Sequence, residues 1–197
     1  LGLYHLIVFL WRRDFQGHLA LGIACWGLAL FFSTLGVVSI QILWPSVEWS
    51  VIGKLTFFGW AVSAPMLIPL IEELVPEATT PKTSKKAISG LLLMCLTGLL
   101  LPHSILRQLY PLFQLATLVP TYFLIKAIVE AFKLGRLSVV EIVVIMTAST
   151  LLSVNDILNN IGVINTGFLL PYYAFILVVR VGIALSQRVT EAQEQAL

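Results

Sequence analysis

Polar side chains that could bind a ligand or exchange hydrogen bonds gather in one segment of a mostly apolar chain. The segment holds hydroxyls, amides and one carboxylate, on Thr147, Ser149, Thr150, Ser153, Asn155, Asp156, Asn159 and Asn160. On a helix, Ser153, Asp156 and Asn160 fall on one face, beside a stripe formed by the two other asparagines. This pattern predicts a polar seam that faces other helices and binds a ligand or couples a signal by changing hydrogen-bond partners. The alternative is that these groups only join neighbouring helices.

A second feature is a pair of opposite charges at comparable depth in the last two apolar segments. Arg180 interrupts the run FILVVRVGIAL, and Glu141 lies about one turn inside the start of the preceding segment. An ionised side chain in lipid needs a partner, so the pattern predicts an interhelical ion pair between Glu141 and Arg180. The alternative is that the Arg180 side chain reaches the aqueous interface by itself.

The sequence contains no residue pattern for covalent chemistry. His5, His18 and His103 are scattered, without metal-ligand spacing. Cys25 and Cys95 each stand alone in an apolar stretch, where thiols behave as small hydrophobic groups. There is no nucleophile–base arrangement, HExxH motif or glycine-rich phosphate loop. We therefore expect no catalytic residue, no metal site and no cofactor, and we expect that this chain is not an enzyme.

The composition places these polar groups in a membrane. Hydrophobic residues make up 58% of the 197 residues and charged residues 11%, whereas about a quarter of a soluble domain is charged. A water-soluble protein of this size cannot bury so much apolar surface. The net charge of +2 gives no indication of nucleic-acid binding. We expect the lipid bilayer to be the solvent of this chain.

Seven apolar segments, separated by short loops, are the expected membrane spans. They cover residues 1–11, 19–43, 51–74, 88–106, 110–132, 139–163 and 168–185. The first is about 16 Å long as a helix, roughly half of a hydrocarbon core. We therefore expect residue 1 to lie within a membrane helix that the natural protein extends upstream. The predicted fold is all-α, a seven-helix transmembrane bundle with a truncated first helix.

Lys and Arg are distributed unequally between the two sides of this expected bundle. One side holds Arg12, Arg13, Lys82, Lys85, Lys86, Lys133, Arg136 and Arg188, and the other holds Lys54 and Arg107. Because basic loops remain in the cytoplasm, the amino end is expected to be extracytoplasmic and the carboxyl end cytoplasmic. The seven-helix domain is expected to cover residues 1–189, and residues 190–197 to begin a cytoplasmic linker helix.

Two parts of the sequence resemble a known family. The segment SVNDILNNIGVINTGFLLPYYAFILVV, Ser153 to Val179, is similar to the end of the bacterial seven-transmembrane receptors with diverse intracellular signalling modules. Three short groups match elements of that family: Asn155-Asp156, Asn165-Thr166-Gly167 and Ser186-Gln187-Arg188. The opening LGLYHLIVFLWRRD resembles its first helix. The chain departs from the family pattern at Tyr172-Tyr173-Ala174, where a small Gly-containing sequence is expected, and at Arg180.

The resemblance implies a transmembrane relay domain of a bacterial sensor in the inner membrane. Members usually carry an extracytoplasmic sensor domain before the first helix. A histidine kinase, diguanylate cyclase, adenylate cyclase or phosphatase follows the seventh helix. These attached modules, the bilayer and a second copy in a homodimer are the partners that the resemblance implies.

Two other membrane functions compete with the relay. A transporter or channel for ions or small solutes would also explain buried polar groups, but we find no internal repeat of the kind transporters show. A retinal protein would need a lysine near the middle of the last helix. The only basic residue there is Arg180, so we do not expect a retinal protein.

Overall fold

The computed structural model describes residues 2–11, 16–34, 38–135, 137–160, 162–167 and 169–194, and for some helical positions only the backbone. These residues form α-helices joined by short connections, with two single turns of 3-10 helix, η1 (Pro76–Ala78) and η2 (Leu115–Thr117). The α-helices are α1 (Gly2–Trp11), α2 (Gln16–Thr34), α3 (Val38–Leu43), α4 (Trp49–Leu74), α5 (Pro81–Leu100), α6 (His103–Gln114), α7 (Leu118–Lys133), α8 (Leu137–Asn160) and α9 (Leu170–Glu194). The prediction of an all-α chain is confirmed.

Three of the described helices are long and apolar enough to cross a bilayer. They are α2, α4 and α5. Shorter apolar helical stretches occupy Gly2–Trp11 and Val143–Asp156. The number of crossings and their direction through the membrane remain predictions.

Several predicted spans have different boundaries in the structure. The span predicted at 19–43 comprises α2 and the short α3, and residues 35–37 lie outside the described part. The span predicted at 88–106 is interrupted because α5 ends at Leu100 and α6 begins at His103. Pro102 has no backbone N–H and disfavours a helical conformation in the preceding residue, so the chain breaks there. The last helix, α9, continues through Glu194 instead of ending at residue 185.

α2 and α4 approach closely where two glycines meet. A Cβ added to Gly59 would lie 2.6 Å from the Gly27 carbonyl oxygen and 2.6 Å from the Phe31 nitrogen. The Ser63 hydroxyl, one turn along α4, donates to the Gly59 carbonyl at 2.6 Å and so is satisfied within its own helix. Small residues let helix backbones pack tightly in lipid. This crossing fixes α2 against α4.

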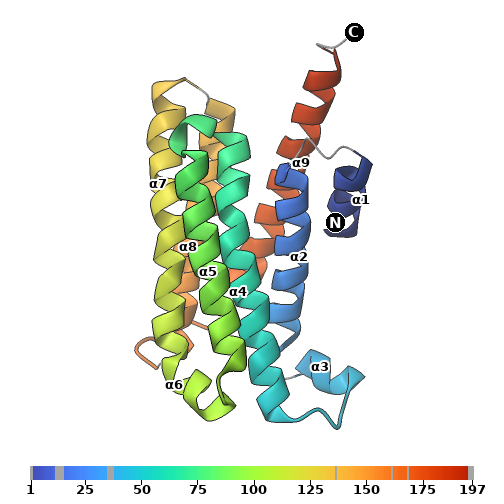
Figure 1. Ribbon diagram of the computed structural model, residues 1–197, viewed down its shortest axis with the longest axis vertical. Helices are drawn as coiled ribbons and strands as arrows, with labels where there is room; N and C mark the ends of the chain where they lie inside the picture. The colour runs from blue at the N-terminus through green and yellow to red at the C-terminus, as the bar shows by residue number, and fades with distance from the viewer. Residues whose placement is uncertain are drawn as a thin grey trace.

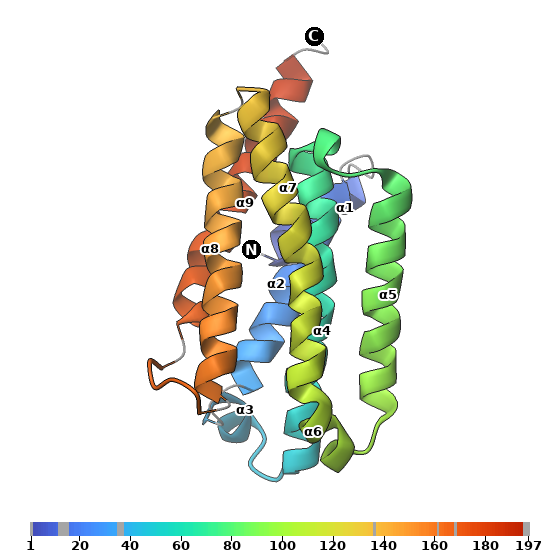
Figure 2. The same ribbon diagram turned by 90° about the vertical axis from the view of Figure 1, so that its left-hand side faces the viewer.

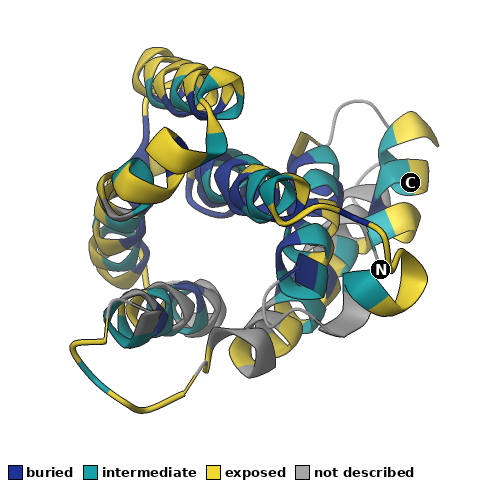
Figure 3. Ribbon diagram, turned by 90° about the horizontal axis from the view of Figure 1, so that it is seen from below, coloured by how far each residue is buried: buried dark blue, intermediate teal, exposed yellow. Residues whose placement is uncertain are grey.

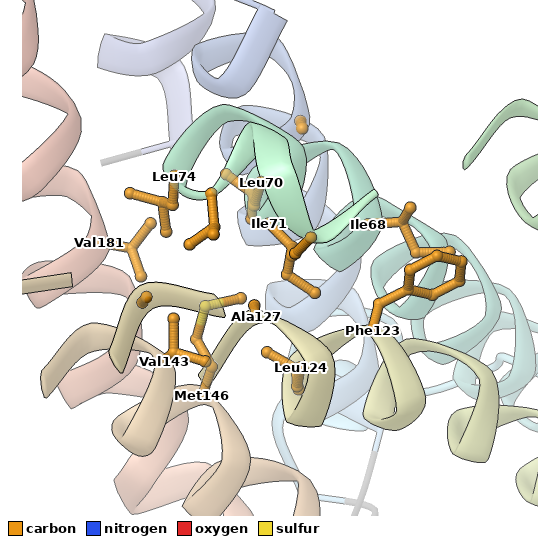
Figure 4. Close-up of a cluster of buried hydrophobic side chains, with 14 of the residues drawn as sticks. Ile68, Leu70, Ile71, Leu74, Phe123, Leu124, Ala127, Val143, Met146 and Val181 are labelled. Carbon is orange, nitrogen blue, oxygen red and sulfur yellow. The ribbon is translucent and has the colours of Figure 1, made fainter. Parts of the chain in front are cut away.

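The larger apolar core joins α4, α7, α8 and α9. Figure 4 shows the buried side chains of Ile71 and Leu74 from α4 and of Leu124 and Ala127 from α7. It also shows Val143 and Met146 from α8 and Val181 from α9. A second cluster lies around Phe57 and Trp60 of α4 and includes Phe113 of α6. Figure 3 shows buried surfaces turned toward the interior of the bundle and exposed surfaces turned outward. Many of the exposed side chains are large and apolar, as expected of a bundle surrounded by lipid.

The helix ends gather at two opposite poles of the bundle. The end of α1, the start of α2, η1 and the end of α9 lie toward one pole (Figure 1). α3, α6 and the α8–α9 loop lie at the other (Figures 1 and 2). Lys82, Lys85 and Lys86 in the first turns of α5 and Lys133 at the end of α7 belong to the first pole. That pole is the predicted cytoplasmic side.

Candidate functional site

The carboxylate of Asp156 holds the residue that precedes α9. Its Oδ1 accepts a hydrogen bond from the Leu169 backbone N–H at 2.8 Å and another from Asn155 Nδ2 at 3.1 Å. The Asp156 residue is 9% exposed. A carboxylate beside the first residues of a helix also lies near the positive end of the helix dipole. Asp156 therefore satisfies a backbone donor at the place where α9 begins.

Two asparagines on α8 bind the same loop. The Thr166 hydroxyl donates to Asn155 Oδ1 at 2.8 Å, and Asn155 Nδ2 donates to the Gly167 carbonyl at 3.3 Å. One turn further along α8, Asn159 Oδ1 accepts from the Gly167 N–H at 3.3 Å. We call these contacts the α8–α9 clamp. It consists of Asn155, Asp156 and Asn159 on α8 and their partners Thr166, Gly167 and Leu169 in the loop.

The loop can fold back onto these α8 side chains because Gly162 lets the chain turn just after the end of α8. Gly162 has a φ of +76°, and its N–H donates to the Asn159 carbonyl at 3.1 Å. The Val163 N–H donates to the Leu158 carbonyl at 2.9 Å. These two bonds form a Schellman motif, which requires a left-handed residue such as glycine. Gly167, also at a φ of +76°, turns the chain again within the clamp.

The other residues of the predicted polar seam are placed differently. Ser153 is partly buried on α8. Thr147 donates its hydroxyl to the Val143 carbonyl of its own helix at 2.9 Å. Asn160 is the last residue of α8, and its side chain lies outside the described residues. The structure thus brings the α8 side chains of Asn155, Asp156 and Asn159 together against the loop that follows α8. Their signal-coupling role remains a prediction.

The predicted ion pair is only partly described. Arg180 lies on α9 with an exposed side chain. Its neighbour Val181 packs in the same core as Val143 of α8, so the backbone brings this part of α9 close to the start of α8. The side chain of Glu141 lies outside the described residues. The Glu141–Arg180 contact remains a prediction.

Among the described residues, the structure reveals a polar contact between two helices that the sequence analysis missed. His5 of α1 and His18 of α2 lie with their Nδ1 atoms 2.9 Å apart, and both residues are 1% exposed. Aligning the first two predicted helices as an antiparallel hairpin could have suggested this contact. Among the described residues, no group of three or more His, Cys, Asp or Glu side chains is arranged to hold a metal ion.

Comparison with known proteins identifies a family. No curated protein and no solved structure matches the chain. The family model described as 7TM diverse intracellular signalling matches residues 1–188, which include the histidine pair, the α8–α9 clamp and most of α9. This family implies a multi-pass helical membrane domain that is associated with intracellular signalling modules and carries no catalytic module of its own. The resemblance seen in the two ends of the sequence is confirmed, and the chain belongs to the 7TM diverse intracellular signalling family.

Proposed function

We propose that this chain relays a signal across the bacterial inner membrane to a cytoplasmic output enzyme. The signal is bound by an attached extracytoplasmic domain or between the helices, and the output enzyme is a histidine kinase or a nucleotide cyclase, acting as a dimer. Family membership supports the signalling role. The observation that carries the proposal is the α8–α9 clamp, which binds the residues immediately before the last helix.

The clamp offers a physical route for the relay. α9 runs without a break for 25 residues, from the clamped loop at one pole to the polar sequence RVTEAQE at the other. In this proposal, the part of α9 from residue 190 to Glu194 begins the cytoplasmic linker helix. Helix shifts of about 1–2 Å are the usual scale of such transitions. A ligand drives the shift only when it binds one of the two positions of α9 better than the other.

The test replaces Asp156 in the natural full-length protein and measures the output activity in isolated membranes. Asp156→Ala removes the acceptor for the Leu169 N–H. We expect normal membrane insertion with basal output changed at least about fivefold, in either direction. Asp156→Asn keeps an oxygen at this position and is expected to have a smaller effect.

Thr97→Ala is the matched control. The Thr97 side chain is exposed on α5 and donates its hydroxyl to the Leu93 carbonyl of its own helix. Wild-type output and wild-type signal response in Asp156→Ala would contradict the relay. If the chain carried ions or solutes into proteoliposomes and Asp156→Ala abolished this flux, a transporter or channel would be favoured over the relay.

A further inference from the structure

The His5–His18 contact is a second polar feature of the bundle, separate from the α8–α9 clamp. It joins α1 to α2, with ring centroids 5.1 Å apart and Nδ1 atoms 2.9 Å apart. At this distance the two nitrogens share one hydrogen: one imidazole donates it and the other accepts it. Both residues are buried, so water does not separate the rings.

The same pair also touches the last helix. A Cβ added to Gly182 of α9 would lie 2.9 Å from His5 Nε2 and 3.9 Å from Leu21 Cδ2. Only glycine allows the imidazole to lie this close to the α9 backbone. His5 therefore contacts α2 through one ring nitrogen and α9 through the other edge of the ring.

The number of protons on the pair decides whether this contact can persist. With one extra proton, the charged imidazole still donates to its neutral neighbour, and a charge-assisted bond is stronger than a neutral one. With two extra protons, both Nδ1 atoms carry hydrogen and both rings are positive. Two donors and two like charges then face each other in a buried site, where repulsion is only weakly screened. The doubly protonated pair must separate.

Other titratable or charged groups lie on the two helices of the pair and on the helices packed against them. On α1, the Tyr4 ring meets His5 edge-on at 5.0 Å between centroids. Cys25 lies further along α2 and packs against Gly2. On α9, Arg180 is two residues from Gly182, and on α4, which packs against α2, Glu73 lies near the end of the helix. Among these types of side chain, histidine is the one whose ordinary titration falls between about pH 5 and pH 8.

We propose that His5 and His18 form a proton-sensitive latch that holds α1 and α2 against α9 and opens when the pair takes up a second proton. The proposal concerns helix packing, so it stands whether or not α9 drives an output enzyme.

The first test measures the separation of α1 and α9 by spin labels in the full chain, held in lipid nanodiscs. Trp11→Cys and Gln187→Cys carry the labels, because both positions are exposed, and Cys25 and Cys95 are replaced by alanine. Burial and the charge of the first ring oppose the second proton, so the measurement extends below the ordinary titration range of histidine. Between about pH 8 and about pH 3.5, the label distance is expected to lengthen by about 5 Å, one helical turn.

Two variants make this measurement specific. His5→Gln keeps a hydrogen-bonding side chain that takes up no proton, so its label distance is expected to stay constant across the pH range. His103→Gln removes the third histidine, on α6, and is expected to keep the full response. A constant distance in the parent chain, or an unchanged response in His5→Gln, would overturn the latch.

A second test needs no change in the pair and so does not depend on the folding of His5→Gln. The His103→Gln chain contains only His5 and His18, and ¹⁵N-labelled imidazole rings report their protonation by NMR. We expect one Nδ1 with hydrogen and one without near neutral pH, and proton uptake in two separate steps. The label distance changes with the second step. If both rings took up their protons over the same pH range without influencing each other, the proposal would be refuted.

Discussion

α9 is held in two places by two different kinds of contact. At its beginning, the α8–α9 clamp binds loop backbone through amide and carboxylate groups, several of them partly exposed. In its middle, the buried ring of His5 packs against Gly182 without space for a single added carbon. One contact is a set of exchangeable hydrogen bonds, and the other depends on the fit of one ring against one backbone.

The difference indicates how each place responds to a disturbance. Water can replace exposed hydrogen bonds at little loss of free energy, so the clamp can change partners in small steps. A close-packed contact has one good arrangement, and any added volume must be absorbed by moving a helix. We expect the start of α9 to be adjustable and its middle to be rigid.

The largest effect should come from Gly182→Val. The new side chain collides with His5 and forces α1 and α9 apart, which we expect to lower the free energy of unfolding by about 3 kcal/mol. Gly90→Val on α5 is the control, since a Cβ there meets no atom within 4 Å, and it should change stability by less than about 0.5 kcal/mol. Steric trapping in detergent measures both. Equal effects at the two glycines would show that the middle of α9 is not rigid.

Asp156→Ala should have an intermediate effect confined to the start of α9. It leaves the partly buried Leu169 N–H without its acceptor, at a cost of about 2 kcal/mol. Hydrogen exchange should accelerate at Leu169 and in the first turn of α9, while the amides around Gly182 stay protected. Exchange that accelerates along the whole of α9 would mean that the two contacts act as one.

Thr166→Ala should have the smallest effect. Its hydroxyl donates to Asn155 from an exposed position where water can take its place, so we expect a loss of about 0.5 kcal/mol. Thr166→Ser keeps the hydroxyl and should behave as the wild type. A loss as large as that of Asp156→Ala would indicate that the clamp is as rigid as the Gly182 contact.

Composition was enough to predict an all-α membrane chain, because 58% hydrophobic residues exclude a water-soluble fold. The helix boundaries were harder to predict from hydropathy. The break before His103 depends on Pro102, which lies inside an apolar run, and the extension of α9 to Glu194 crosses from apolar into polar residues without a break. The hydropathy of the residues changes where the surroundings change from lipid to water, whereas a helix can continue across that boundary.

The candidate site was predictable in its residues but not in its contacts. Asn155, Asp156 and Asn159 were recognisable as polar groups on one part of a helix. Their partners depend on the path of the following loop, which positive φ values at Gly162 and Gly167 determine. The histidine pair is a different case, since its members belong to different helices and no single-helix periodicity relates them.

Because α9 is continuous, its two ends have a fixed rotation about the helix axis relative to each other, as well as a fixed separation. At about 1.5 Å per residue, its 25 residues extend about 37 Å, more than the roughly 30 Å of a hydrocarbon core. Each residue also turns the backbone by about 100°. Inserting one residue beyond the membrane would therefore rotate whatever follows by more than a quarter of a circle, whereas inserting seven would return it to within about 20° of its original orientation.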